Sequence, residues 1–423
     1  MHTTILAALI VAAAQVPGST QGPHSTQGPG SIQGHGAADL TPAGPAPAEP
    51  AAADVWISGE GGYHTYRIPS VVRAPDGALL AFCEGRKGGR GDTGDIDLVM
   101  KRSTDGGATW GEQRVLWDDG PNVCGNPCPV LDRDTGILHL FLTHNLGRDH
   151  ESEIIAGTSS GTRTVWVMTS ADGGLAWSAP REVTASTKRR DWTWYATGPG
   201  VGIQLEVGPH AGRLVIPCDH IEADTRRYYS HVLLSDDHGA TWRIGGRSRR
   251  DQLNECQVAE LDSGELVLNM RNYNRQKRAR AVTRSGDGGE SFGEVRWDEA
   301  LPEPICQAGL VTVRAPRPGG GLERWVAFSN PASPDRRERM LVRVSRDGAA
   351  TWSTAALLHG QAAAYSCLVD LTEGAAPAVG CLYERGAEHP YERITFEAVR
   401  LTAPDPARTD PDGTGVAAPA GRR

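Results

Sequence analysis

Short apolar runs alternate with glycine-rich polar turns along most of the chain. The apolar runs are bounded by Gly, Asp, Asn and Ser, a pattern typical of β-strands joined by tight turns. Helical patterns rich in Ala, Glu, Lys and Leu are scarce after the first 55 residues. The pattern therefore predicts an all-β fold. The runs that we expect to be strands cover residues 136–144, 164–170, 213–220, 230–236, 264–272 and 339–345.

One polar turn, called the Asp box below, occurs five times. The Asp boxes read STDGGATW (103–110), SADGGLAW (170–177), SDDHGATW (235–242), SGDGGESF (285–292) and SRDGAATW (345–352). In each, Ser and Asp can bond backbone groups of the turn, Gly supplies a positive φ, and the aromatic ring can lie between strands. We expect each box to close a hairpin. The aspartates that we therefore take as structural are Asp105, Asp172, Asp237, Asp287 and Asp347.

The spacing of the boxes predicts the architecture. They begin 67, 65, 50 and 60 residues apart, and repeats of this size are typical of propellers, solenoids or arrays. A unit of this length suits a four-stranded blade. Residues 54–402 would hold six of them, so we expect a six-bladed β-propeller with four-stranded antiparallel blades, one of them without a box. In the last box Ala349 replaces the usual glycine.

The two ends of the chain have a different composition. Residues 1–53 begin with an apolar run that resembles a secretory signal and is too short to span a membrane, followed by a linker rich in Gly, Pro and Ala. The run lacks the usual preceding Lys or Arg. Residues 403–423 have the composition of a disordered tail. We expect a secreted monomer without a membrane span; the alternative is a cytosolic enzyme with a loose leader.

Charge and cysteine content exclude some classes of function. The formal net charge is −8, which argues against a nucleic-acid binder. The basic run RQKRAR (275–280) therefore indicates a solvated strand or loop.

Cys124 and Cys128 are four residues apart, but no second pair with zinc spacing accompanies them, so we interpret the eight cysteines as buried thiols. His144 and His150 lack a third ligand and are taken as polar loop residues. No metal is expected.

Several polar residues lie in strand-like segments where a propeller would normally have apolar ones. Propellers bind ligands at the central axis, so such residues are candidates for a site there. They are Arg67 in YRIP, Glu255 in NECQ, Arg271 in NMRN, Arg337 in DRRERM, Tyr365 in AYS and Glu384 in LYERG.

These motifs, in this order and together with the Asp boxes, resemble the sialidases, which are six-bladed propellers that cleave terminal sialic acid. The resemblance covers roughly residues 57–400. It implies an arginine triad of Arg67, Arg271 and Arg337, with Arg336 and Arg339 as alternatives for the third member. Cys367 stands where the family often has Asp, next to the expected nucleophile, and we do not expect it to replace that residue.

The resemblance also implies the remaining roles. Tyr365 matches the nucleophile, Glu255 its base, and Glu384 the acid that holds the first arginine. Asp92 matches the acid/base residue, with Asp95 as the alternative. Arg86 matches an arginine that lines the sugar pocket near the 4-hydroxyl group.

The residue types suit this chemistry. Sialic acid has a carboxylate on its anomeric carbon, and arginine binds carboxylates through two parallel hydrogen bonds. An anionic nucleophile would approach against that charge, whereas a neutral phenol would not. A phenol has a pKa of about 10, so it needs an adjacent base. Tyrosine-nucleophile sialidases are a known exception to the two-carboxylate glycosidase scheme, and retention follows from two successive inversions.

The expected function is an exo-α-sialidase acting on sialylated glycoconjugates without a cofactor. A trans-sialidase or a hydrolase of deaminated sialic acid would share the same motifs. A sialic-acid-binding propeller without turnover is the third alternative, but it would have little use for Tyr365, Glu255 and Asp92 together.

Overall fold

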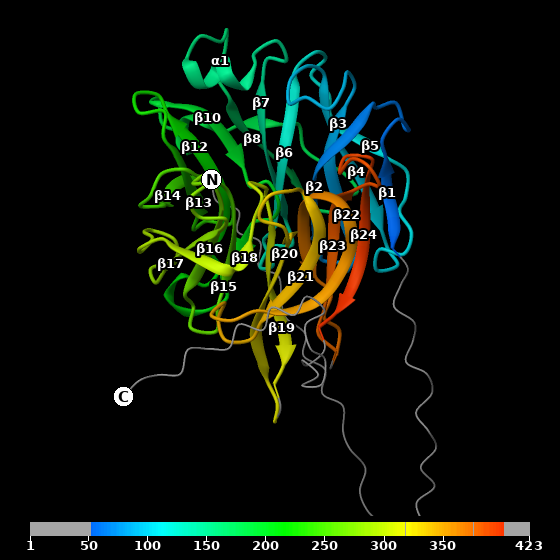
Figure 1. The fold of residues 1–423 in the computed structure, drawn as a ribbon, viewed down its shortest axis with the longest axis vertical. Coiled ribbons are helices and arrows are strands. Elements are labelled where there is room, and N and C mark those ends of the chain that lie inside the picture. Colours follow the sequence, from blue (N-terminus) through cyan, green and yellow to red (C-terminus); the bar gives the residue numbers. More distant parts are fainter. Residues whose placement is uncertain (1–51, 318, 375, 402–423) are drawn as a thin grey trace, which may run out of the picture. The chain divides into compact units, whose positions relative to one another are not determined.

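The structure is a computed structural model that describes residues 52–401 except 318 and 375. Strands dominate this part of the chain, as the pattern predicts (Figure 1). The predicted leader and tail lie outside the described residues, apart from the two residues that precede position 54. The helical elements among the described residues are α1 (Glu151–Ala156), α2 (Thr184–Thr187) and the 3-10 helix η1 (Gly208–His210).

The strands form four sheets. The first contains β2 (Thr65–Arg73), β3 (Leu79–Arg86), β4 (Ile96–Ser103), β5 (Arg114–Trp117), β6 (Val123–Leu131), β7 (Leu138–Asn145), β8 (Thr164–Ser170) and β9 (Arg181–Glu182). The second contains β10 (Trp192–Thr197), β11 (Ile203–Gln204), β12 (Leu214–Glu222), β13 (Tyr228–Ser235) and β14 (Arg243–Arg247). The third contains β15 (Leu253–Glu260), β16 (Leu266–Asn272), β17 (Ala279–Ser285) and β18 (Arg296–Pro302). The fourth contains β19 (Gly309–Pro316), β20 (Leu322–Pro331), β21 (Glu338–Ser345), β22 (Ser353–Asp370), β23 (Ala378–Arg385), β24 (Arg393–Arg400) and β1 (Ala53–Ile57).

The first and last strands of the described chain pair with each other. β1 runs antiparallel to β24, with Ala53 opposite Phe396 and Ile57 opposite Arg393 (Figure 1, blue beside red). The long strand β22 pairs with β21 through its first half and with β23 through its second half. The fourth sheet is therefore continuous across two successive antiparallel units. All six runs expected to be strands coincide with β7, β8, β12, β13, β16 and β21.

Each Asp box closes a hairpin, as predicted. The serine hydroxyl donates to the aspartate at 2.7–2.9 Å in all five boxes. The same hydroxyl accepts the backbone N–H of the box's fifth residue at 2.9 Å. That residue has a positive φ in every box, including Ala349 at 61°. A non-glycine residue there costs about 1 kcal/mol in backbone strain.

Box aromatics connect successive units. Trp110 contacts Phe396 of β24, Trp177 contacts Phe82 of β3, and Trp242 contacts Phe141 of β7, each ring edge against face. In each of these three pairs the tryptophan belongs to the hairpin that its box closes, and the phenylalanine lies in a strand outside that hairpin. The boxes therefore stabilise the packing between units as well as their own turns.

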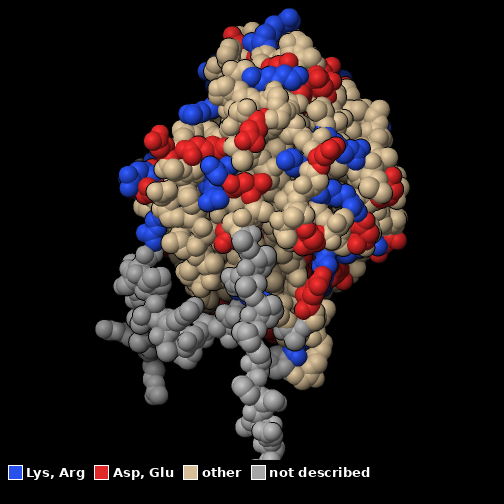
Figure 2. Space-filling view, turned by 90° about the vertical axis from the view of Figure 1, so that its right-hand side faces the viewer, with Lys and Arg blue, Asp and Glu red and all other residues tan. Residues whose placement is uncertain are grey.

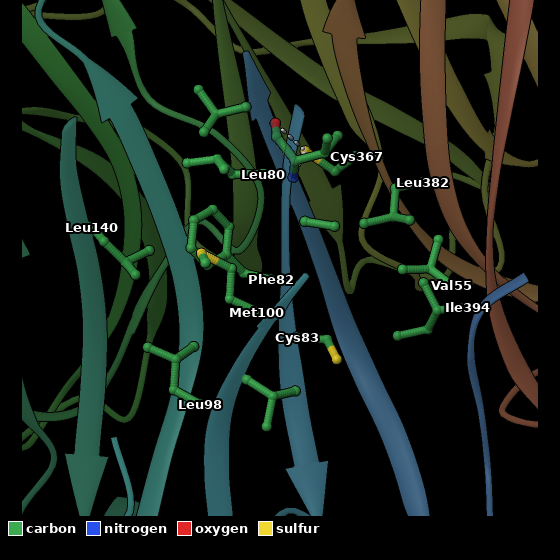
Figure 3. Packing of buried hydrophobic residues seen from close by; sticks show 14 of the residues in the cluster. Val55, Leu80, Phe82, Cys83, Leu98, Met100, Leu140, Cys367, Leu382 and Ile394 are labelled. Atoms are coloured by element: carbon green, nitrogen blue, oxygen red, sulfur yellow. Dashed lines mark hydrogen bonds between the residues drawn. The ribbon is translucent and has the colours of Figure 1, made fainter. Parts of the chain in front are cut away.

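The largest cluster of buried apolar side chains lies where the first and last units meet (Figure 3). Leu80 and Phe82 of β3 pack there with Cys367 of β22 and Leu382 of β23. All eight cysteines of the chain are buried and unpaired, in agreement with their interpretation as core thiols.

The described surface shows no segregation of charge on the face in Figure 2, where acidic and basic side chains are interspersed. Within the basic run, Arg280 is a correction to the expectation of a solvated segment. It lies in β17, is 1% exposed and pairs with buried Glu303 at 2.6 Å. Among the described helices, none has the length and apolar character needed to cross a membrane.

Candidate active site

The structure brings the eight residues expected from the sequence into one connected cluster. Arg67 and Glu255 lie in β2 and β15, which are edge strands of the first and third sheets, and Tyr365 lies in β22 within the fourth sheet. Arg86 ends β3, Asp92 follows it in a loop, Arg271 lies in β16, and Arg337 immediately precedes β21. Glu384 lies in β23. The contacts below connect them.

Glu384 holds the first arginine and the backbone around it. Its carboxylate is fully buried and accepts hydrogen bonds from Arg67 Nε at 3.2 Å and Nη2 at 3.5 Å. It also accepts the backbone N–H groups of Ile68 at 2.9 Å and Tyr365 at 3.0 Å. The backbone of Ile68 is in the left-handed region at φ 63°. One carboxylate therefore fixes both Arg67 and the backbone of the tyrosine.

Tyr365, Glu255 and Arg271 form a closed triangle of hydrogen bonds. The Tyr365 hydroxyl donates to Glu255 Oε1 at 2.6 Å. Arg271 Nη1 donates to Glu255 Oε2 at 2.5 Å and to the Tyr365 oxygen at 2.9 Å. Burial, together with the Glu255 charge, raises the pKa of Tyr365 well above its usual value. The phenol is neutral in the free site, and its closest acceptor is a carboxylate.

Three guanidinium groups surround the Tyr365 ring. Arg67 lies 4.9 Å and Arg337 5.7 Å from its centroid, while Arg271 bonds its hydroxyl. Arg337 also donates to the hydroxyl of Tyr391 at 2.7 Å, and the Tyr391 ring lies 3.9 Å from Arg67. The geometry favours Arg337 over Arg336, because Arg336 is exposed and pairs with Glu338.

Asp92 and Asp95 occupy different environments. Asp92 Oδ1 lies 2.6 Å from Arg86 Nη2 and 3.6 Å from Arg67 Nη1, and its side chain is 55% exposed. Burial raises its pKa, but the charges of Arg86 and Arg67 outweigh burial and hold the pKa of Asp92 below its usual value. Asp95 instead pairs with Lys87 at 3.0 Å. Of the two, Asp92 adjoins the arginine cluster.

Sequence reasoning missed several residues of this region. Glu84 binds Arg86 at 2.5 Å and accepts the backbone N–H of Asn126 at 2.9 Å. Tyr391 joins Arg67 to Arg337. Arg163 donates to Asn126 Oδ1 at 2.7 Å. Of these residues, only Glu84 could have been predicted from its local sequence, because it lies two residues before Arg86 and therefore on the same face of β3.

Two groups of described side chains have the composition of a metal site, and neither is part of the arginine cluster. Asp95, Asp97 and Asp118 all surround Lys87 Nζ, at 3.0, 3.0 and 3.4 Å, so an ammonium group fills their centre. Asp132, Asp134 and His238 form the second group. Asp132 already accepts hydrogen bonds on both oxygens. Neither His144 nor His150 belongs to such a group among the described residues.

Comparison with known proteins identifies the family. The BNR repeat-like domain family matches residues 77–377. A sialidase of Micromonospora viridifaciens is 35% identical over 347 residues, covering 79% of this chain and 52% of that protein. Human Sialidase-3 is 30% identical over 388 residues, covering 78% of this chain and 88% of that protein. The chain therefore spans about half the length of one curated relative and most of another.

Solved structures agree with this result. The Hadza microbial sialidase Hz136 superposes with a TM-score of 0.73 at 31% identity, covering 83% of this chain and 68% of that one. A leech intramolecular trans-sialidase superposes with a TM-score of 0.65 at 18% identity, covering 82% and 70%, and shows likeness of fold. Both matches support an all-β, propeller-like scaffold for this chain. The chain belongs to the sialidase family.

Proposed function

We propose that the protein is an exo-α-sialidase that hydrolyses terminal α-linked sialic acid from glycoconjugates, with retention, through a covalent intermediate on Tyr365. The observation that supports this most is the Tyr365–Glu255 hydrogen bond of 2.6 Å among three arginines. A neutral nucleophile beside its base is arranged where an anionic substrate group would bind.

The arginines supply the binding step. Arg67, Arg271 and Arg337 present guanidinium groups from three different units, and bidentate pairing with a carboxylate is their strongest interaction. Arg67 is already oriented by Glu384 through two nitrogens, which leaves Nη1 directed toward Asp92. A sialic acid carboxylate bound here brings its anomeric carbon next to the Tyr365 hydroxyl.

Covalent catalysis follows in two steps. In the first, the Tyr365 oxygen attacks the anomeric carbon, its proton passes to Glu255, and the bond to the leaving oxygen breaks as Asp92 donates a proton to it. In the second, Asp92 removes a proton from water, the water oxygen displaces Tyr365, and Glu255 returns the proton to the phenolate. Two inversions give net retention.

Asp92 must gain its proton before the first step. In the free site its pKa is held low by Arg86 and Arg67. A bound substrate carboxylate places negative charge beside Arg67 and displaces water, and both effects raise the pKa of Asp92. Substrate binding thus prepares the acid for catalysis.

The test is release of the sugar from 4-methylumbelliferyl glycosides of N-acetylated and of deaminated sialic acid. Fluorescence release from either glycoside, with the α-anomer of the sugar detected first by NMR, supports the proposal. No release from either would refute the hydrolase and favour a binding protein. Product analysis in the presence of lactose separates hydrolysis from transfer, because a trans-sialidase would form sialyllactose.

We also propose export from the cell, which mass analysis of the culture medium would test.

The six-bladed architecture belongs to the same proposal. If the fourth sheet is divided within β22 and the first between β5 and β6, the described strands form six successive antiparallel units. They are β2–β5, β6–β9, β10–β14, β15–β18, β19 to the first half of β22, and the second half of β22 to β24 with β1. An experimental structure would test this division.

A further inference from the structure

A glycine-rich loop, residues 87–95, joins β3 to β4 and carries Asp92. A Cβ added at Gly88, Gly89 or Gly94 would meet no heavy atom of another described segment within 4 Å. The absence of a side chain at these positions also gives the backbone more conformational freedom. Packing at these positions therefore does not hold the loop, and its polar contacts decide where Asp92 lies.

The tip of the loop lies on Arg86, the last residue of β3. Arg86 Nη1 donates to the backbone oxygens of Arg90 at 2.6 Å and Gly91 at 3.0 Å. Its Nη2 lies 2.6 Å from Asp92 Oδ1. These contacts orient the tip of the loop, but they do not join its two ends.

Lys87 joins the two ends of the loop. Its backbone N–H donates to the backbone oxygen of Asp95 at 3.0 Å, and its ammonium nitrogen lies 3.0 Å from Asp95 Oδ1. The end of the loop is itself bound to another part of the chain, because the Gly94 N–H donates to the backbone oxygen of Gly147 at 2.8 Å. Lys87 therefore fastens the beginning of the loop to an end that is already held.

The ammonium group of Lys87 also pairs with two carboxylates outside the loop. Its Nζ lies 3.0 Å from Asp97 Oδ2 in β4 and 3.4 Å from Asp118 Oδ2, just after β5. Asp97 is 1% exposed, and its Oδ2 also accepts the Tyr63 hydroxyl at 2.6 Å. A buried carboxylate depends on such partners, unlike the exposed ion pairs that contribute little. One cation thus connects the loop to β4 and to the segment after β5.

The position of the loop affects the reaction through Asp92. A general acid must lie within hydrogen-bond reach of the oxygen that it protonates, and a displacement of about 1 Å can cost about 100-fold in rate. We propose that Lys87 is a positioning residue that holds the loop where Asp92 reaches the leaving oxygen, an inference that rests on the proposed function. Loss of Lys87 should therefore resemble a partial loss of Asp92.

The experiment compares kcat/KM for a lactoside and a 4-methylumbelliferyl glycoside of the same sialic acid. Lactose needs protonation to leave, whereas methylumbelliferone needs much less help. Lys87→Met should lower kcat/KM about tenfold for the lactoside and less than about twofold for the methylumbelliferyl glycoside. Lys87→Arg keeps the cation and should recover most of the activity on the lactoside. A general structural defect would lower both values equally.

A double-mutant cycle tests whether Lys87 acts through Asp92. In an Asp92→Asn background, Lys87→Met should cause no further loss on the lactoside, because residues that act as a unit are not additive. If Lys87→Met folds poorly, Asp95→Asn combined with Asp118→Asn provides a second variant. It leaves Lys87 only Asp97, changes side chains that are 33% and 48% exposed, and should also lower the lactoside value selectively.

Lys101→Met is the matched control, because Lys101 also belongs to this hairpin, in β4, but donates to the backbone oxygen of Val55 at 2.8 Å. It should leave the ratio of the two kcat/KM values unchanged. An unchanged ratio in the Lys87 or double variant that folds, or a further tenfold loss in the Asp92→Asn background, overturns the inference and leaves the sialidase proposal standing. Failure of the wild type to cleave either glycoside overturns both.

Discussion

The hydroxyl of Tyr365 lies 2.6 Å from Glu255, although 110 residues separate the two in the chain. Arg271 bonds both members of the pair, at 2.9 Å and 2.5 Å. A buried tyrosine can find a neutral acceptor in any β-protein. A tyrosine hydroxyl that donates to a carboxylate, which in turn neutralises an arginine, is a more specific arrangement than a hydroxyl with a neutral acceptor. The predictions below start from this arrangement.

Tyr365→Phe should reduce turnover severely while leaving substrate binding nearly intact. The ring would still lie beside Arg67 and Arg337, but the atom that attacks the sugar would be absent. We expect kcat on the preferred fluorogenic sialoside to fall at least about 100-fold, with KM changed only a few-fold. Tyr383→Phe is the control, because that buried hydroxyl bonds Glu397. A Tyr365→Phe enzyme with half of the parental kcat would contradict the assigned nucleophile.

Asp92→Asn should affect substrates according to their leaving group. Sialyllactose needs protonation of its leaving oxygen, so its turnover should fall about 10²–10⁴-fold. A methylumbelliferyl leaving group needs less help, and its cleavage step should fall much less. Asp95→Asn should change both substrates only slightly, since Asp95 pairs with Lys87. Equal losses for the two substrates in Asp92→Asn would contradict the assignment of Asp92 as the acid. Larger losses in Asp95→Asn than in Asp92→Asn would assign that role to Asp95.

Glu384→Gln should weaken both substrate binding and stability. The variant leaves Arg67 buried without its anionic partner, and removal of one member of a buried pair costs about 3–5 kcal/mol, less for an isosteric amide. We expect KM to rise about tenfold and the urea midpoint to fall. Glu373→Gln, which removes the exposed partner of Arg73, should change the free energy of unfolding by less than about 1 kcal/mol. Similar effects in the two variants would mean that Glu384 has no special role.

His220 and His231 should make the fold sensitive to acid. Their Nδ1 atoms are 3.0 Å apart, and both rings are fully buried. Burial lowers the pKa of His231 to about 3 and lowers that of His220 also. Below pH ~6.5 the unfolded chain takes up protons that the folded rings refuse, so stability falls with falling pH by about 1.4 kcal/mol per pH unit for each ring that stays neutral.

Urea unfolding between pH 7 and pH 4.5 measures this effect. His231→Gln should reduce the dependence of the unfolding free energy on pH, whereas His64→Gln, which changes an exposed ring, should not. If the slope of stability against pH is the same in wild type and His231→Gln, the buried histidines do not cause acid sensitivity.

The sequence predicted what depends on local pattern and motif. The strands, the box hairpins and the eight clustered residues follow from alternating polarity, turn chemistry and recognisable motifs. Arg163 could not be found in this way. It lies immediately before the strand predicted over 164–170, and its burial depends on Trp194 from another sheet. Asn126 was missed because its backbone hydrogen bond is made to Glu84, which lies 42 residues earlier in the chain.

The pairing of β1 with β24 has a consequence for synthesis of the protein. Because Ala53 must meet Phe396, this pairing cannot form until nearly the whole described chain has left the ribosome. Contacts between such distant residues slow folding, and until they form the edges of both strands remain open to other chains. Nascent protein should therefore be most prone to aggregation before β24 has been synthesised.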